Sequence, residues 1–186
     1  MTAPTWPRVS AILAESGLGP DFSGIPVDVL AAAQARGVAV HALAEAVVYR
    51  YLDESDVTPT TAPYLHAFRA FLSESAFQPV AAEFRVEHIG WKFCGHPDLW
   101  GWLLAKRALI DLKTSASLDL DAAARQLAAY RMAMEATRPT EPIEVTAALQ
   151  LRADATYRFH ELDTHGRAEQ EFTAAVVVYH AKRRTR

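Results

Sequence analysis

Gly95-His96-Pro97-Asp98 and, twelve residues further on, Asp111-Leu112-Lys113 are the two segments that decide the fold of this chain. The first segment precedes one apolar strand pattern, and the second ends the next one. Because side chains two apart on a strand point to the same face, Asp111 and Lys113 share a face, and a β-meander can bring Asp98 beside them. The sequence therefore predicts a cluster of two carboxylates and one amine.

Such a cluster has a definite chemistry. Two neighbouring carboxylates repel each other, which raises the pKa of one of them unless a cation lies between them. A magnesium ion prefers oxygen ligands and keeps several waters, so two carboxylates and a carbonyl are sufficient protein ligands. A protonated lysine cannot bind that ion, but it can hold an attacking water or offset charge that develops on a phosphate. This set of residues is suited to phosphodiester hydrolysis.

The chain before this cluster is predicted to be mostly helical. Apolar residues recur at helical spacing, and prolines and glycines separate the segments, with Gly37 ending the second helix. The stretch 53–62, with Pro59 and Pro63 beside it, is expected to be a linker. The expected helices cover residues 11–16, 26–36, 38–51 and 64–73.

Strand patterns begin at Gln78-Pro79. The expected strands cover residues 80–88, 91–94, 99–104 and 108–112, as a meander, and then 145–151 and 157–160. Amphipathic spacing predicts a helix over 120–136 and a closing helix over 168–182. This order of elements predicts an α/β fold with a central mixed β-sheet flanked by helices and a helical N-terminal region.

The length and composition indicate one ordinary globular domain. With 186 residues, 51% of them apolar, we expect a single domain over 1–186. Its parts are a helical region 1–75, a catalytic sheet and helix 78–163, and a closing helix with a basic tail 164–186. The single cysteine, Cys94, excludes an intramolecular disulfide, a cysteine-only zinc site and a four-cysteine iron–sulfur cluster.

No signal peptide or membrane span is expected. No stretch approaches the ~18 consecutive apolar residues of a membrane helix, so the chain is expected to be soluble and cytoplasmic. The formal net charge is −3, which argues against a nucleic-acid footprint over the whole surface. Four cations lie in the last five positions, and two interpretations stay open for them: a solvated helix end or a phosphate contact. They are Lys182, Arg183, Arg184 and Arg186.

The order Pro97-Asp98, twelve residues, Asp111-Leu112-Lys113 and a following helix resembles the PD-(D/E)XK nuclease core. Two further motifs narrow the resemblance to its RecB-like and viral exonuclease-type nuclease domains. Gln126 and Tyr130 match a Gln-X-X-X-Tyr element, and Gly37 to His41 looks like a Gly-X-X-X-His element. The resemblance spans roughly His41 to Tyr130.

The resemblance implies a role for each matching residue. His41, Asp98 and Asp111 would bind Mg²⁺ or Mn²⁺, and the carbonyl of Leu112 would be a fourth ligand. Lys113 would be the catalytic lysine. Two residues would border the active-site groove, holding the nucleic-acid backbone or the lysine: Gln126 and Tyr130.

A structural interpretation of the same residues stays open. His41 could be a histidine of an amphipathic helix whose ring nitrogens have ordinary hydrogen-bond partners. Gln126 and Tyr130 could serve only the packing and solubility of their helix. Glu45 lies one turn beyond His41 and could act through a water or remain an exposed glutamate.

Further candidates lie before the first aspartate. Glu83 and Glu87 are expected to share a face of one strand and could add a carboxylate, with Glu87 the preferred candidate. Three aromatic residues could stack on bases or belong to the core: Trp91, Trp100 and Trp102.

The function predicted from the sequence is a divalent-metal-dependent DNA exonuclease. The resemblance implies a role in recombination, repair or phage and mobile-element DNA processing, on single- or double-stranded DNA with ends favoured. The expected partners are a second copy of the chain or a recombination protein. The sequence contains no phosphate-binding loop of a helicase, so any unwinding of DNA would come from a partner. The alternatives are an endonuclease of the same fold and a non-catalytic protein that binds DNA or a partner.

Overall fold

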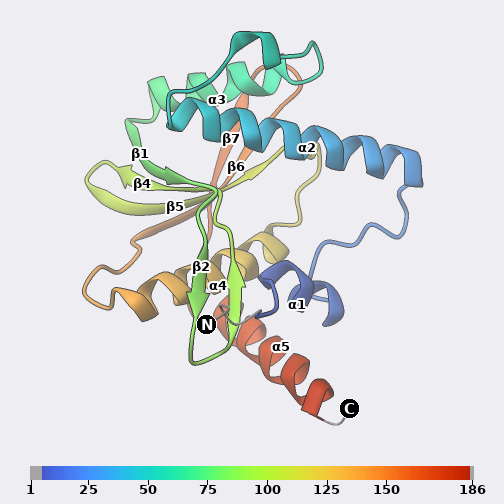
Figure 1. The fold of residues 1–186 in the computed structure, drawn as a ribbon, viewed down its shortest axis with the longest axis vertical. Helices are drawn as coiled ribbons and strands as arrows, with labels where there is room; N and C mark the ends of the chain where they lie inside the picture. The colour runs from blue at the N-terminus through green and yellow to red at the C-terminus, as the bar shows by residue number, and fades with distance from the viewer. Residues whose placement is uncertain (1–5, 185–186) are drawn as a thin grey trace.

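The computed structural model describes residues 6–184 (Figure 1). Its helices and strands follow in this order: α1 (Val9–Glu15), α2 (Val27–Val48), η1 (Glu54–Asp56), α3 (Ala62–Glu74), β1 (Phe77–Ala82), β2 (Val86–His88), β3 (Phe93–Gly95), β4 (Leu99–Leu103), β5 (Lys106–Lys113), α4 (Leu120–Thr137), β6 (Val145–Leu151), β7 (Tyr157–Glu161) and α5 (Arg167–Arg184).

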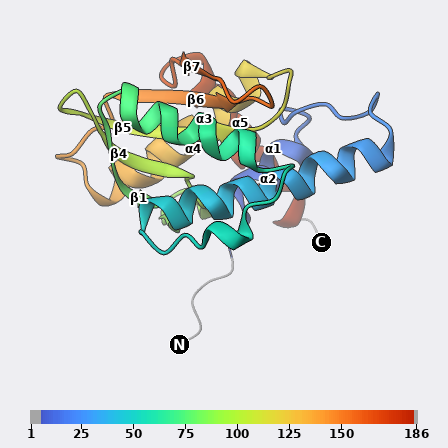
Figure 2. The ribbon, with the colours of Figure 1, turned by 90° about the horizontal axis from the view of Figure 1, so that it is seen from above.

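The centre of the fold is a five-stranded sheet in the order β1-β4-β5-β6-β7. The β5–β6 pair is parallel and the other pairs are antiparallel, so the sheet is mixed. A parallel pair needs a long crossover, and α4 supplies it between β5 and β6. The strands β2 and β3 form a separate hairpin. Helices cover both faces of the sheet, with α2 and α3 on one side and α4 and α5 on the other (Figures 1 and 2).

The core consists of two apolar clusters, one on each face of the sheet, because β5 is buried on both faces. Ile110 and Leu112 belong to the cluster under α2 and α3. Leu109 belongs to the cluster with α1, α4 and α5. The residues that alternate with Ile110 and Leu112, including Asp111, therefore face α4. This alternation directs the polar residues at the end of β5 toward one helix.

The structure confirms the predicted fold class, a mixed sheet flanked by helices after a helical N-terminal region. The meander, however, is wrong. The strand β1 pairs with β4, while β2 and β3 leave the sheet as an inserted hairpin. The single strand expected over 80–88 is also wrong. The extended backbone is interrupted between β1 and β2, where Glu83 has a φ of 48°. The division of the chain into a single nuclease domain stays a prediction.

The helix end expected at Gly37 is wrong as well. Residues Val27–Val48 form one continuous helix, α2, through this glycine. A glycine inside a helix costs only about 1 kcal/mol relative to alanine. Burial of Val40 and Ala44 against the sheet offsets a cost of that size. The uninterrupted helix is what carries His41 to the end of β5.

Helix α2 also bears on the expectation that no segment resembles a membrane span. By length and composition alone, α2 is long and apolar enough to cross a membrane. Its second half packs into the core through Val40 and Ala44, and its first half exposes Val27 and Val29. The apolar character of the second half is thus accounted for by packing on the sheet.

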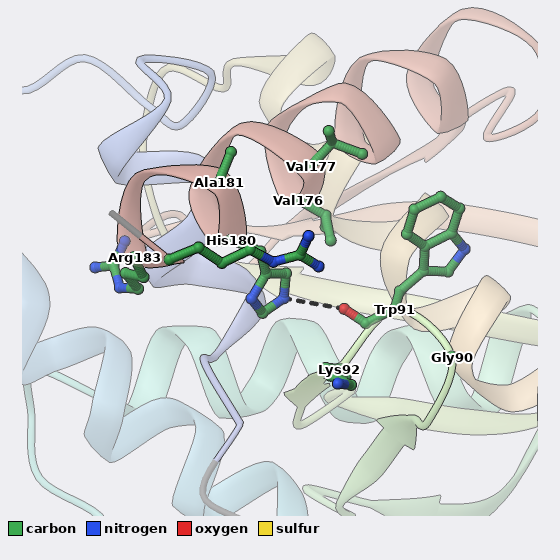
Figure 3. Close-up of a pocket in the computed structure, with 9 residues that line it drawn as sticks. Gly90, Trp91, Lys92, Val176, Val177, His180, Ala181 and Arg183 are labelled. Carbon is green, nitrogen blue, oxygen red and sulfur yellow. Dashed lines mark hydrogen bonds between the residues drawn. The ribbon is translucent and has the colours of Figure 1, made fainter. Parts of the chain in front are cut away.

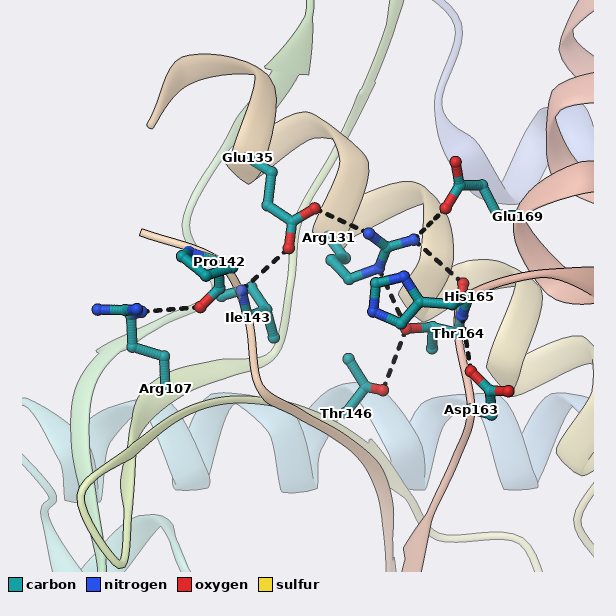
Figure 4. A network of polar contacts seen from close by, with 10 residues as sticks. All are labelled: Arg107, Arg131, Glu135, Pro142, Ile143, Thr146, Asp163, Thr164, His165 and Glu169. Atoms are coloured by element: carbon teal, nitrogen blue, oxygen red, sulfur yellow. Dashed lines mark hydrogen bonds and ion pairs between the residues drawn. The ribbon is translucent and has the colours of Figure 1, made fainter. Parts of the chain in front are cut away.

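A buried arginine ties α4 to the segment before α5 (Figure 4). The guanidinium of Arg131 donates hydrogen bonds to the side chain and the carbonyl of Thr164, each at 3.2 Å. It also pairs with Glu135 at 2.8 Å and with Glu169. Glu135 in turn accepts a hydrogen bond from the Ile143 amide at 3.0 Å. A buried cation is tolerated when its donors are paired in this way, and the network fixes α4 against the sheet.

Candidate active site

The predicted site residues converge where β4 begins and β5 ends. Asp98 immediately precedes β4, and Asp111 and Lys113 lie on either side of Leu112 at the end of β5. The antiparallel register pairs Leu99 with Ile110, so Asp98 and Asp111 lie at adjacent positions across the two strands. Both carboxylates are buried, with relative exposures of 6% and 1%.

Helix α2 brings His41 into contact with two carboxylates. Its Nδ1 lies 2.9 Å from Glu83 Oε1 and 3.4 Å from Asp98 Oδ1. One ligand atom from each of these three residues lies within 4.8 Å of the other two, which is a spacing that a metal ion could bridge. His41 therefore belongs to a polar cluster at the strand ends and does not pack as an isolated helix histidine.

Glu83 reaches this cluster because the backbone turns sharply after β1. It has a φ of 48°, and its amide donates a hydrogen bond to the Asp98 carbonyl at 3.0 Å. The preference for Glu87 was wrong. Glu87 lies on β2, pairs with Arg85 at 2.7 Å and lines a different cavity. The two glutamates do not share a strand face because the strand is interrupted between them.

The backbone of Leu112 connects Asp98 to His41. Its amide donates a hydrogen bond to Asp98 Oδ2 at 2.5 Å, and its carbonyl accepts one from His41 Nε2 at 3.2 Å. The carbonyl proposed as a ligand from the sequence resemblance is therefore directed at the cluster. One residue of β5 thus supplies the donor that holds the aspartate and an oxygen beside the histidine.

A second polar chain begins at Asp111. Lys113 Nζ lies 2.6 Å from Asp111 Oδ2 and 3.3 Å from Gln126 Oε1. The amide nitrogen of Gln126 donates a hydrogen bond to the Tyr130 hydroxyl at 3.0 Å. Gln126 and Tyr130 share one face of α4, as their spacing predicts, and that face holds the lysine.

The charges of the cluster shift each other's protonation. Burial disfavours the imidazolium form of His41, but Asp98 and Glu83 outweigh it and raise the pKa of His41 to about 11. Burial also opposes ionisation of Asp98, yet His41 and Lys113 hold its pKa below the ordinary value. For Asp111 burial dominates, and with the repulsion from Asp98 it raises the pKa to about 6 despite Lys113.

The charges of Asp98 and Asp111 also shift the pKa values of Lys113 and Tyr130. Burial alone would lower the pKa of Lys113, but Asp111 and Asp98 raise it, so the side chain stays an ammonium. Burial, reinforced by the charges of Asp98 and Asp111, raises the pKa of Tyr130 and keeps its hydroxyl neutral. The site therefore holds a fixed ammonium and a neutral phenol beside its carboxylates.

The donor set fits a divalent cation. Neither carboxylate oxygen of Asp111 has a hydrogen-bond partner among the described residues, although Oδ2 forms the ion pair with Lys113. A buried carboxylate without donors is costly unless a cation balances it. The carboxylates of Glu83, Asp98 and Asp111 and the Leu112 carbonyl are hard ligands of the kind that magnesium and manganese accept. The His41 imidazole is a borderline ligand once it has released its proton, which metal binding displaces.

The other sequence candidates lie at the margin of the site or outside it. Glu45 lines a cavity of about 490 Å³ together with His41 and Glu83. Trp100 is half-buried on β4, under the guanidinium of Arg138. Trp102 is more exposed and lies at the end of β4 away from Asp98. Trp91 lies in the β2–β3 hairpin.

The comparison with solved structures supports the fold. One similar structure, from Eubacterium rectale, is described as a "putative exonuclease"; the superposition has a TM-score of 0.54 at 12% sequence identity. The superposition covers 92% of this chain and 70% of that one. At this identity the likeness shows a shared fold. No protein-family model and no curated protein matches the sequence.

Gly95 provides a test of how tightly the site is packed. A Cβ added at this position would overlap the Tyr130 ring. We expect Gly95→Ala to displace the ring and to lower the free energy of unfolding by about 1–3 kcal/mol, as overpacking typically does. Urea denaturation measures the change. The matched control is Gly24→Ala, where nothing lies within 4 Å of the added Cβ and a change within about 0.5 kcal/mol is expected. Equal effects of the two variants would contradict the packing argument.

Proposed function

We propose that this protein is a divalent-metal-dependent nuclease of the PD-(D/E)XK type that hydrolyses phosphodiester bonds in DNA. The observation that carries the proposal is that His41, Glu83 and Asp98 meet at the strand ends, beside the ion pair of Asp111 and Lys113. Asp98 and Asp111 come from neighbouring strands, His41 from α2 and Glu83 from a strand break, so no single local motif accounts for their meeting. The sequence resemblance to RecB-like domains supports the same proposal, because the residues of this site other than Glu83 occupy the positions of that family's motifs.

The proposed cofactor is Mg²⁺ or Mn²⁺. His41, Glu83, Asp98, Asp111 and the Leu112 carbonyl would hold it. When bound, such an ion lowers the pKa of a coordinated water and stabilises negative charge on the phosphate. The imidazole nitrogen would favour Mn²⁺ more than an all-oxygen site does.

The remaining polar residues orient the substrate and the water. The ammonium of Lys113, held by Asp111 and Gln126, can donate hydrogen bonds to an attacking water or to a phosphate oxygen. Tyr130 positions Gln126 through its hydroxyl and so limits the orientations of the lysine. Asp111 and Asp98 favour the ammonium form of Lys113, so we assign it the role of a donor and an electrostatic stabiliser.

Within this activity we favour an exonuclease in DNA recombination, repair or phage and mobile-element DNA processing. A net charge of −3 argues against broad wrapping of duplex by one subunit, and a local groove suits a threaded end better. We propose a cytoplasmic location, and a second subunit or a recombination partner could complete the DNA-binding surface. The alternatives are an endonuclease of the same fold and a non-catalytic DNA- or partner-binding protein.

Metal binding gives a direct test of the ligand set. We expect Glu83→Gln and His41→Ala each to weaken Mn²⁺ binding at least about tenfold, because each removes a ligand of the cluster. Isothermal calorimetry of the purified variants measures this. Glu87→Gln is the matched control, since Glu87 is paired with Arg85 and should leave Mn²⁺ affinity unchanged. Equal affinities of the Glu83 and Glu87 variants would exclude Glu83 as a ligand.

Catalysis gives the second test. Cleavage of end-labelled DNA should require a divalent ion, stop in EDTA, and fall by at least about a hundredfold in Asp111→Asn, which removes an anionic ligand at constant size. Lys113→Ala should lose turnover to a similar extent yet keep Mn²⁺ binding, because the lysine acts on water and phosphate. Undiminished cleavage by pure Asp111→Asn protein would disprove a nuclease site at these residues. Metal binding without any cleavage by the wild type would favour the non-catalytic alternative.

Substrate topology separates an exonuclease from an endonuclease. We expect linear single-stranded or duplex DNA to be shortened progressively, while a covalently closed circle of the same sequence survives. Low salt should be used, because phosphate contacts are then least screened. Gel analysis over time distinguishes the two outcomes. Nicking of circles as fast as linear molecules are shortened would replace the exonuclease by the endonuclease.

A further inference from the structure

A groove lies between the tip of the β2–β3 hairpin and the last turns of α5, outside the polar cluster described above. It has a volume of about 480 Å³. Figure 3 shows His180 at its centre, with Trp91 and Arg183 on opposite sides and Lys92 beneath. His180 Nε2 lies 3.1 Å from the Trp91 carbonyl, so a hydrogen bond joins the hairpin to the helix. The groove walls are therefore held together by a direct contact.

The groove is cationic. Lys92 and Arg184 line it, their side chains are exposed, and neither has an acidic partner among residues 6–184. Arg183 also lines it; this residue pairs with Glu15 at 2.6 Å and lies 3.5 Å from the centre of the Tyr179 ring. Arg186, part of the basic tail in the sequence, lies outside the described residues. Two uncompensated cations from different elements thus face the same space.

The helix dipole explains only part of this arrangement. Cations in the last turn of α5 favour the negative end of that helix, as the sequence alone suggests. Lys92, however, belongs to the hairpin, so the dipole of α5 does not account for its place in the groove. Trp91 adds a half-buried aromatic side chain to the same wall. Cations that follow a backbone and an aromatic side chain that stacks on a base are the two components of single-strand binding sites.

We propose that this groove binds single-stranded DNA on its way to the catalytic cluster. Phosphates would contact Lys92 and Arg184, and an unpaired base would stack on Trp91. The inference rests on the proposed nuclease function for its substrate. It adds a binding site for the strand at a distance from the scissile bond.

The hairpin sets the distance between groove and cluster. Its two ends are at the cluster, since Glu83 precedes β2 and Asp98 follows β3. Lys92 is six residues before Asp98, so the two are at most about 20 Å apart along an extended chain. A stacked strand carries one phosphate per ~3.4 Å, so the groove and the cluster would be bridged by up to about six nucleotides.

Charge reversal tests the cationic part of the groove. We expect the double variant Lys92→Glu/Arg184→Glu to bind a 20-nucleotide single strand at least about tenfold more weakly, by fluorescence anisotropy without metal. The slope of log affinity against log salt should fall by about 1.4, which corresponds to two lost phosphate contacts. The matched control is Lys106→Glu/Arg158→Glu, which reverses two exposed cations elsewhere and should bind as the wild type does. Equal losses in both double variants, or no loss in either, would overturn the proposal.

Substrate length separates the groove from the catalytic site. The groove variant should cleave a dinucleotide at the wild-type rate, because no residue that lines the groove belongs to the cluster, and should lose efficiency on strands longer than about six nucleotides. Equal losses on both lengths would overturn the assignment. Strand binding by the wild type without cleavage would instead reject the nuclease function and leave the groove in place.

Trp91→Ala tests the preference for single strands. It should weaken binding of the 20-nucleotide strand about five- to tenfold and leave binding of a blunt duplex of equal length unchanged, because paired bases cannot stack on the indole. Trp102→Ala, at the far end of β4, is the matched control and should change neither. Equal loss for both substrates in Trp91→Ala would overturn single-strand binding.

Discussion

The hydrogen bond from the Leu112 amide to the Asp98 carboxylate is the interaction on which the site depends. A buried carboxylate is stable only when it accepts hydrogen bonds or faces positive charge, and Asp98 does both, through Leu112 and His41. The same residue of β5 offers its carbonyl to His41. One backbone unit therefore fixes α2, β4 and β5 relative to each other, and the positions of the other polar residues follow from it.

The cluster balances three carboxylates against two cations, and the balance is incomplete. His41 pairs with Glu83 and Asp98, and Lys113 pairs with Asp111 Oδ2, yet Asp111 Oδ1 is buried without a partner among the described residues. The pKa of Asp111 rises to about 6 as a result of burial and of repulsion by Asp98. A divalent cation would remove that cost. The arrangement thus favours metal binding but lowers the stability of the metal-free protein. The apolar clusters on both faces of the sheet offset this loss of stability.

The inserted hairpin links the two parts of the proposed substrate path. Its ends carry Glu83 and Asp98 at the polar cluster, and its tip carries Trp91 and Lys92 at the cationic groove beside α5. The Tyr130 ring packs on Gly95 in the hairpin, so α4 supports both the lysine and the hairpin. Positioning of the strand and chemistry at the phosphate would therefore rely on one helix.

The sequence by itself determined the α/β class, most element boundaries to within a few residues, and the grouping of Asp98, Asp111 and Lys113, while the family resemblance added His41. These inferences rest on local periodicity and on motif order, which the chain carries in short segments. Only the tertiary structure decided which strands pair, that α2 continues through Gly37, that Glu83 rather than Glu87 joins the cluster, and that the hairpin and α5 share a groove. The physical reason is that strand pairing, a positive φ and the meeting of distant cations depend on long-range packing, which overrides local propensity and leaves no periodic signal in the sequence.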